Sequence, residues 1–267
     1  MLTRLALAAA LIINPTPDQT LDANQGLATG RAVLETGHVD IGPRYRDGRW
    51  TIQIHDDHAV PAVWRDPADT VLRVRDTARQ TVPGDPAYAF LGAAAGSEVH
   101  VVPQTERPGV VWIGWNTQDP GVLGAVGRGV TMTLRGVQGP GDVTVFLQSG
   151  NLGAPQVLWS SAKPFPQPIF VESNTHTHAN WVFGAPGTYL VAVDISAELA
   201  DGSAVGAARS CGSRSATPPI RRTPSAPRSI SLCRPLRPRS LRDQKQDSIR
   251  ATRSRLRSVS SWSRAWS

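Results

Sequence analysis

The motif His176-Thr177-His178 places two imidazoles two residues apart. On a β-strand, residues i and i+2 face the same side of the sheet, so both imidazoles would point the same way. Imidazole is a preferred ligand of Zn²⁺ and related transition metals, and a protein site for these ions usually has three or four protein ligands. The motif therefore predicts part of a metal site whose other ligands lie elsewhere in the chain.

A second pair with the same spacing occurs near the N-terminus, within residues 37–40. If this segment is also a strand, the imidazole of His38 and the carboxylate of Asp40 share one face. We therefore predict a site for Zn²⁺ or another transition metal, made of His38, Asp40, His176 and His178. The sequence leaves one alternative open, in which these side chains only form hydrogen bonds within the fold.

The chain lacks the common hydrolase signatures. It has no Gly-x-Ser-x-Gly and no His-Glu-x-x-His motif, and both cysteines, Cys211 and Cys233, lie in a basic C-terminal segment. Residues 124–129 are rich in glycine but lack the Lys-Ser/Thr pair of a phosphate-binding loop. The adjacent acids Asp56 and Asp57 are expected in a solvated turn. We predict a protein without enzymatic activity, with a hydrolase built on the His/Asp metal site as the alternative.

The elements that must position these ligands are strands. Between residues 32 and 205, short β-branched or aromatic runs with a period of two alternate with Gly/Pro turns, and no amphipathic helix is convincing. This pattern predicts an all-β fold, an immunoglobulin-like β-sandwich. The clearest strands are expected at residues 50–54, 71–75, 110–115, 130–134, 143–147 and 188–195.

The strand expected at residues 110–115 is apolar on both faces. Trp112 and Gly114 would lie on one face, and Ile113 and Trp115 on the other. A strand that is apolar on both faces is typical of the interior of a sheet. We therefore expect this strand to be central.

The N-terminus has the pattern of a secretory signal peptide. Arg4 precedes a short apolar run, residues 5–13, which is too short to span a bilayer as a helix. We assign residues 1–23 to a signal peptide and predict a secreted or cell-surface protein. No other long apolar run follows, so we expect no transmembrane segment in the mature chain.

Charge divides the chain into two unlike parts. Residues 1–203 carry 13 basic and 19 acidic residues, whereas residues 204–267 carry 15 basic and two acidic ones. The acidic part argues against nucleic-acid binding by the folded domain, for which we expect residues 30–205. The tail, residues 206–267, is rich in Arg, Ser and Pro, which predicts disorder. Its abrupt start favours an origin by frameshift; a nucleic-acid or membrane-binding arm and a cell-wall linker are the alternatives.

Several segments together resemble a known family. Residues 174–183, with the pattern His-x-His-x-Asn-Trp-x-Phe, precede a Pro-Gly-x-Tyr turn and an alternating strand. The combination resembles the actinobacterial surface-anchored repeat domain, most closely in proteins of the choice-of-anchor M type. The resemblance covers residues 30–205 and includes residues 33–40, 89–92, 102–105 and 112–117.

The resemblance implies an exported, non-catalytic protein displayed at the cell surface and associated with a metal-type ABC transporter system. The family's His-x-His maps onto His176 and His178, and its Gly-His-Val-Asp segment maps onto His38 and Asp40. The family domain continues into a further strand and an anchor, which here we expect the basic tail to replace. The alternative function is a structural or adhesive wall protein that binds polysaccharide or a protein partner through its tryptophans.

Overall fold

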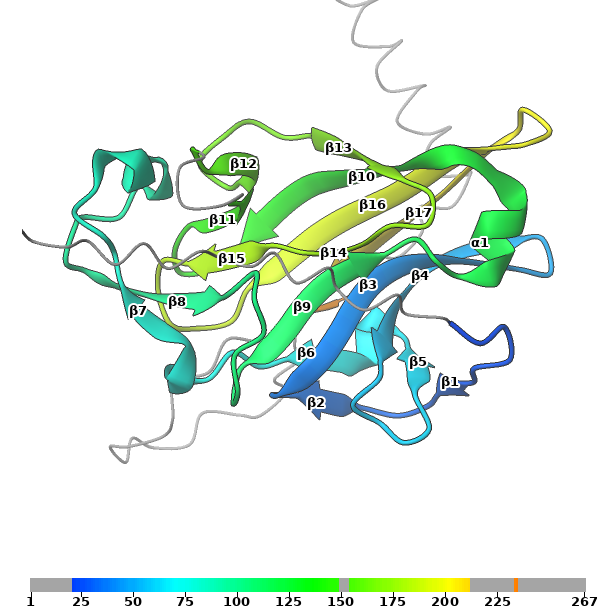
Figure 1. Cartoon of the computed structure of the whole chain (residues 1–267), viewed down its shortest axis with the longest axis horizontal. Helices are drawn as coiled ribbons and strands as arrows, with labels where there is room; N and C mark the ends of the chain where they lie inside the picture. The colour runs from blue at the N-terminus through cyan, green and yellow to red at the C-terminus, as the bar shows by residue number, and fades with distance from the viewer. Residues whose placement is uncertain (1–20, 149–153, 212–232, 235–267) are drawn as a thin grey trace, which may run out of the picture. The chain divides into compact units, whose positions relative to one another are not determined.

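The computed structural model describes residues 21–148, 154–211 and 233–234, which all lie in one compact unit of the chain (Figure 1). The unit consists of β-strands in three larger sheets and one two-stranded sheet. Among the described residues, one short α-helix and three 3₁₀ helices connect the strands; the 3₁₀ helices are η1 at Pro67–Asp69, η2 at Asp76–Ala78 and η3 at Pro86–Leu91. The all-β sandwich predicted from the alternating sequence pattern is confirmed.

The first sheet has six strands in the order β1-β5-β4-β3-β9-β14. β3 and β4 form a hairpin around Asp47-Gly48, both of which have positive φ, as a type I′ hairpin turn requires. β3 and β9 run parallel, whereas β9 and β14 run antiparallel. The strands span Leu27–Ala28 (β1), Gly37–Arg46 (β3), Arg49–Asp56 (β4), Val63–Arg65 (β5), Val111–Asn116 (β9) and His176–His178 (β14).

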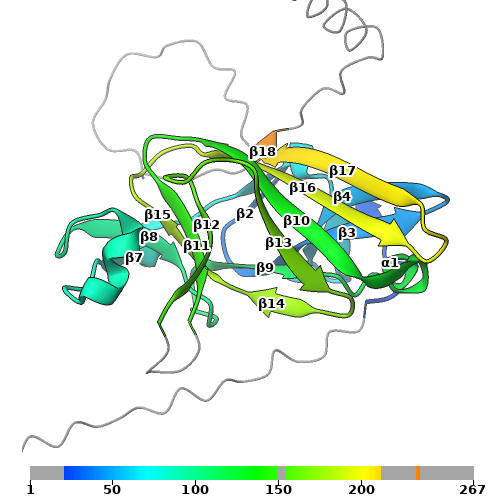
Figure 2. The ribbon, with the colours of Figure 1, turned by 90° about the horizontal axis from the view of Figure 1, so that it is seen from above.

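The other two large sheets are antiparallel throughout (Figure 2). One contains β13 (Gln167–Glu172), β10 (Val126–Gln138), β16 (Leu190–Leu199), β17 (Ala204–Cys211) and β18 (Cys233–Arg234). The other contains β12 (Gln156–Ser160), β11 (Val143–Leu147), β15 (Asn180–Phe183), β8 (Glu98–Val102) and β7 (Arg79–Thr81). A small parallel pair joins β2 (Ala32–Leu34) to β6 (Thr70–Leu72).

One large hydrophobic core holds the three sheets together. Val39 and Ile113 from the first sheet, and Met132 and Ile195 from the second, are at most 2% exposed and belong to this core. The indole of Trp50 on β4 also donates a hydrogen bond to the carbonyl of Ile195, 2.9 Å away, which fixes the first sheet to the second. Because alternate residues of β3 and β9 fill the core, the residues between them face the outside of the sandwich.

Tyr189, at the start of β16, closes the turn that precedes this strand. Its hydroxyl donates to the carbonyl of Ala185 at 2.7 Å, and its ring is fully buried against Phe183. This arrangement is similar to the tyrosine corner of immunoglobulin-like sandwiches, in which a tyrosine hydroxyl bonds to the backbone a few residues upstream. The Pro-Gly-x-Tyr pattern of the sequence thus corresponds to a turn tied down by a buried phenol.

The expected elements differ from the observed ones in detail. β11 has the expected bounds, whereas β6 ends at Leu72 and not at residue 75. The sequence reading missed α1 (Pro120–Ala125), which begins where the Asp119 carboxylate accepts hydrogen bonds from the amides of Gly121 and Val122. β9 is paired on both sides, as an interior strand, but is next to the edge strand β14.

Regular structure extends beyond both expected ends of the domain. β1 precedes residue 30, and β17 continues past Val205 to Cys211, paired along β16. A strand paired with β16 therefore occupies the start of the segment in which the basic tail was expected. Most of the predicted signal peptide, residues 1–20, and the tail residues 212–232 and 235–267 lie outside the described residues. Within the described residues, no helix is both long and apolar enough to cross a membrane.

Candidate metal centre

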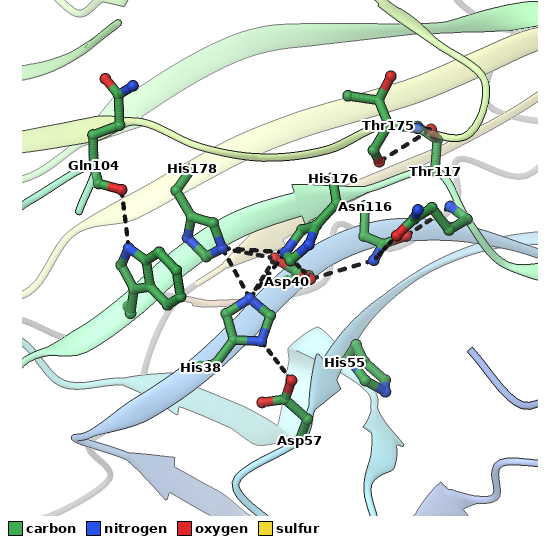
Figure 3. A network of polar contacts seen from close by, with 12 residues as sticks. His38, Asp40, His55, Asp57, Gln104, Asn116, Thr117, Thr175, His176 and His178 are labelled. Carbon is green, nitrogen blue, oxygen red and sulfur yellow. Dashed lines mark hydrogen bonds and ion pairs between the residues drawn. The ribbon is translucent and has the colours of Figure 1, made fainter. Parts of the chain in front are cut away.

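Three neighbouring strands bring the four predicted ligands together on the outer face of the first sheet (Figure 3). β3 carries His38 and Asp40, and β14 carries His176 and His178. Between them, Gly114 of β9 pairs with Asp40 on one side and with His178 on the other. The expectation that each i, i+2 pair shares a strand face is confirmed for both pairs.

The three imidazoles point their Nε2 atoms at one another. The Nε2 atom of His38 is 3.0 Å from that of His176 and 2.8 Å from that of His178. The Nε2 atoms of His176 and His178 are 3.2 Å apart. All three nitrogens can therefore reach a single point between them.

The carboxylate of Asp40 completes the cluster as its least exposed member. Asp40 is fully buried, and its Oδ2 is 3.0 Å from His176 Nε2. Its Oδ1 is 3.5 Å from His38 Nε2 and 3.8 Å from His178 Nε2, and it has no hydrogen-bond partner among the described residues. A buried carboxylate oxygen without such a partner is costly unless a cation neutralises it.

These distances fit a tetrahedral ion. Zn–N bonds of 2.0–2.1 Å place the corners of a tetrahedron about 3.3 Å apart, close to the separations among the three imidazole nitrogens. In a square-planar site, two of the three imidazole nitrogens would have to lie on opposite sides of the ion. At the same bond length these two nitrogens would be about 4 Å apart. Three imidazoles and one carboxylate are also a donor set that suits Zn²⁺ better than Mg²⁺ or Ca²⁺.

Gly114 gives the cluster its space. A Cβ atom at this position would be 2.7 Å from Cε1 of His178 and 2.8 Å from the carbonyl oxygen of Thr177, and it would overlap Asp40 Oδ1. Glycine within a strand often marks such a close approach of other groups. The ligands of β3 and β14 thus meet above the one residue of β9 that carries no side chain.

The electrostatics of the cluster favour an ionised carboxylate on Asp40 and a neutral imidazole on His178. Burial alone would raise the pKa of Asp40, but the hydrogen bond with His176 and the neighbouring imidazoles hold it below its usual value. Burial lowers the pKa of His178 to about 3, against the opposing effect of Asp40. Neutral imidazole and ionised carboxylate are the forms that bind a metal.

His38 responds differently because it has a second acidic neighbour. Burial would lower the pKa of His38, but the hydrogen bond with Asp57 and the charge of Asp40 raise it above its usual value. The Nδ1 atom of His38 lies 2.5 Å from Oδ2 of Asp57. The sequence reading missed this role of Asp57.

The neighbouring acid Asp56 forms an ion pair within the fold and is not part of the cluster of four predicted ligands. It is buried at the end of β4, and Nε of Arg65 donates to its Oδ2 at 2.7 Å. The expectation of a solvated Asp56-Asp57 turn is wrong for Asp56, because Arg65 on the adjacent strand compensates its buried charge. The opposite directions of the two side chains agree with the alternation expected along a strand.

An aromatic and a polar side chain of β9 flank the ligands. The indole of Trp112 stacks on the imidazole of His178, with ring centroids 3.7 Å apart, and donates to the carbonyl of Gln104 at 3.1 Å. Nδ2 of Asn116 donates to Asp40 Oδ2 at 3.4 Å. Both residues belong to residues 112–117, a segment noted in the sequence for its apolar strand pattern and for its resemblance to the surface-anchored family, but not as part of the metal site.

The remaining histidines lie outside the cluster. His55 is buried against Trp64, and its Nε2 is 3.0 Å from Oε1 of Gln25. His100 is buried on β8, with Nε2 3.3 Å from Asp76 Oδ1. His58 is exposed on the loop after β4. The structure therefore separates the four predicted ligands from the other histidines of the chain.

The tryptophans form no exposed row in the described part of the chain. Trp64, Trp115, Trp159 and Trp181 are at most 4% exposed, and Trp50 and Trp112 are half-buried. They pack in the core, against the second sheet or against the four predicted ligands, so binding of polysaccharide or a protein partner through a row of exposed tryptophans is not supported. Comparisons with protein-family models, curated proteins and solved structures found no match to this chain.

Proposed function

We propose that this chain is an exported, non-catalytic protein that binds Zn²⁺ or a related transition metal through His38, Asp40, His176 and His178. The observation that carries the proposal is the convergence of three imidazole nitrogens on a fully buried carboxylate whose Oδ1 lacks a hydrogen-bond partner among the described residues. A cation at the centre of these four groups would satisfy all of them at once.

The ligand count argues for binding rather than catalysis. Catalytic zinc sites keep a coordination position for water or substrate beside three protein ligands, whereas four protein ligands close a tetrahedral site. The side chains of Asp40, His176 and His178 are at most 7% exposed, which leaves little room for a substrate beside the ion. We therefore favour a closed metal site over the hydrolase alternative.

The sequence supports export to the cell surface. The signal-like N-terminus and the resemblance to actinobacterial surface-anchored domains both favour it, and that resemblance also favours an association with a metal-type ABC transporter system. Detection of the mature chain in the culture medium or the wall fraction would test this part of the proposal.

Isothermal titration of the whole chain with Zn²⁺ tests the metal site. Since Cys211 and Cys233 are themselves possible zinc ligands, both are replaced by Ser in every protein compared. We expect one equivalent of Zn²⁺ to bind at micromolar metal or below. The double variant His176→Ala, His178→Ala should lose this binding, because two of the four ligands are gone.

His100→Gln is the matched control, since it alters a buried histidine that is paired with a carboxylate outside the cluster. It should bind Zn²⁺ as the parent does. No binding by the parent at micromolar Zn²⁺, or undiminished binding by the double variant, would contradict the proposal.

A further inference from the structure

We propose that Asp57 is a positioning residue of the metal site, which holds His38 in the Nδ1–H tautomer and thereby slows release of the ion. This inference rests on the proposed metal site. Asp57 itself lies behind His38, on the side of the imidazole away from the cluster (Figure 3). It would therefore act through His38 and not as a fifth ligand.

The geometry of His38 assigns different tasks to its two nitrogens. Nε2 is within 3.0 Å of the corresponding atoms of His176 and His178, whereas Nδ1 is 2.5 Å from Oδ2 of Asp57. A carboxylate can only accept at this contact, so Nδ1 must carry the proton. The lone pair of the neutral ring then lies on Nε2, the atom that faces the cluster. Carboxylates that hold metal-binding histidines in this way increase ligand basicity.

His38 is the ligand through which the ion would exchange. Its side chain is 14% exposed, compared with 7% for His176, 2% for His178 and none for Asp40. An ion entering or leaving the cluster must pass its most exposed side. The residue that fixes the ring of His38 therefore restrains the path of the ion.

The structure holds Asp57 in place from both sides. Its neighbour Asp56 is anchored by Arg65, and the next residue, His58, lies on the backbone of Gly37. Gly37 has φ of +80°, and a Cβ there would come within 2.7 Å of the His58 ring, so this close approach requires glycine. The start of the loop is thus packed onto the strand that carries His38, which aims the Asp57 carboxylate at Nδ1.

Metal affinity and release rate of Asp57 variants test the inference in the Cys-free background described above. Asp57→Ala removes the acceptor and should weaken Zn²⁺ binding 10- to 100-fold, mostly through faster dissociation measured by transfer to a chelator. Asp57→Asn keeps an oxygen that can accept from Nδ1–H but loses the charge, so its effect should be smaller. We expect Zn²⁺ release to be fastest from Asp57→Ala, slower from Asp57→Asn and slowest from the parent.

The tautomer of His38 gives a readout that a loss of packing would not produce. At a pH above the raised pKa of His38, where its imidazole is neutral, long-range ¹⁵N–¹H spectra of the metal-free chain should show His38 as the Nδ1–H form in the parent and in Asp57→Asn. In Asp57→Ala the Nε2–H form should appear, since the hydrogen bond that selects the other form is gone. Asp76→Ala is the matched control, because it removes the carboxylate partner of His100 at a distance from the site; it should leave Zn²⁺ release unchanged.

The outcomes separate this inference from the proposed function. If the parent binds no Zn²⁺, the proposed function fails. If the parent binds Zn²⁺ but Asp57→Ala releases it at the parental rate with His38 still in the Nδ1–H form, the metal site stands and the role of Asp57 is refuted. Faster release with an unchanged tautomer would likewise refute the positioning role.

Discussion

The indole ring of Trp112 lies nearly parallel to the imidazole ring of His178, at an interplanar angle of 13° with the centroids 3.7 Å apart. The same indole is 5.1 Å from the ring of His38, so one aromatic side chain touches ligands from both sides of the cluster. The hydrogen bond from its Nε1 to the carbonyl of Gln104 fixes its orientation. Trp112 therefore covers one flank of the site with an apolar surface.

This contact predicts a fluorescence signal for metal binding. Coordination of Zn²⁺ by His178 changes the charge beside the indole of Trp112, so the tryptophan fluorescence of the chain should change as Zn²⁺ is added. This change should disappear in Trp112→Phe. Loss of the stack, worth about 0.5–1.5 kcal/mol, should weaken binding by roughly tenfold or less. Trp159→Phe, which alters a buried tryptophan packed on Trp181, is the control and should keep the signal. An undiminished fluorescence change in Trp112→Phe would contradict the assignment of this signal to Trp112.

Gly114→Ala should abolish metal binding while leaving the chain folded. The added methyl group would displace Asp40 and His178 and would press on the backbone carbonyl of Thr177, which cannot move without opening β14. Overpacking of this kind costs about 1–3 kcal/mol of the free energy of unfolding. Calorimetric titration measures the binding and urea denaturation measures the stability.

Gly136→Ala is the matched control for this substitution, since no heavy atom lies within 4 Å of a Cβ built at that strand glycine. It should change neither zinc affinity nor stability by a comparable amount. Parental zinc affinity in Gly114→Ala would show that the ligands do not meet over this residue.

Five of the six strands predicted from the sequence have five or more residues, enough to show alternation, whereas the sixth overlaps the three-residue strand β6 and the ten-residue β3 was not among them. β11 was predicted with its observed bounds, and β4, β9, β10 and β16 were each predicted in part. Strands of two or three residues, such as β1 and β2, are too short for a period to be visible. The parallel pairing of β3 with β9 joins distant parts of the chain and leaves no local signal, yet it places Asp40 beside Gly114.

The four candidate ligands could be predicted from the sequence because i, i+2 spacing places two side chains on the same face once a strand is assumed. Their supporting residues were not. Asp57 depends on a loop that Arg65 and Gly37 hold in place, and both are distant from His176 and His178 in the chain. Gly114 carried a usable signal, because a glycine inside an apolar strand often marks a close approach.

The buried pair of Asp119 and Arg44 should be a major determinant of stability. Asp119 Oδ2 lies 3.3 Å from Nε of Arg44, and both side chains are at most 5% exposed. Asp119 also caps α1. Removing one partner of a buried ion pair costs about 3–5 kcal/mol, so Asp119→Ala should lower the free energy of unfolding by that amount in urea denaturation.

Asp69→Ala provides the comparison, since Asp69 is an exposed acid in the short helix η1. Its effect should stay within about 0.5 kcal/mol. Asp119→Asn, which keeps the oxygen that caps α1, should be less harmful than Asp119→Ala. Equal stability of the Asp119→Ala and Asp69→Ala proteins would show that the buried pair contributes nothing.

Tyr189→Phe tests the buried phenol and its dependence on pH. Burial raises the pKa of Tyr189, against the opposing effect of the hydrogen bond that its hydroxyl oxygen accepts from the backbone amide of Ala185, 3.2 Å away. Since the pKa in the folded state is above that in the unfolded state, the phenol favours folding below pH of about 10, and this contribution is lost as pH rises toward the folded-state pKa. Near neutral pH, Tyr189→Phe should therefore lower the free energy of unfolding by about 1–2 kcal/mol through the lost hydrogen bond. Above pH 10 the difference in the free energy of unfolding between Tyr189→Phe and the parent should become smaller, because only the parent must keep a buried phenol protonated.

Urea denaturation at neutral pH and at several values above pH 10 measures this difference directly. Tyr88→Phe is the matched control, because the hydroxyl of Tyr88 pairs with the side chain of Gln148, 3.1 Å away, which water can replace. The free energy of unfolding of Tyr88→Phe should differ little from that of the parent at each of these pH values. A difference for Tyr189→Phe that stays constant across this range would mean that the phenol titrates alike in the folded and unfolded chains. The corner would then stabilise the fold through its hydrogen bond alone.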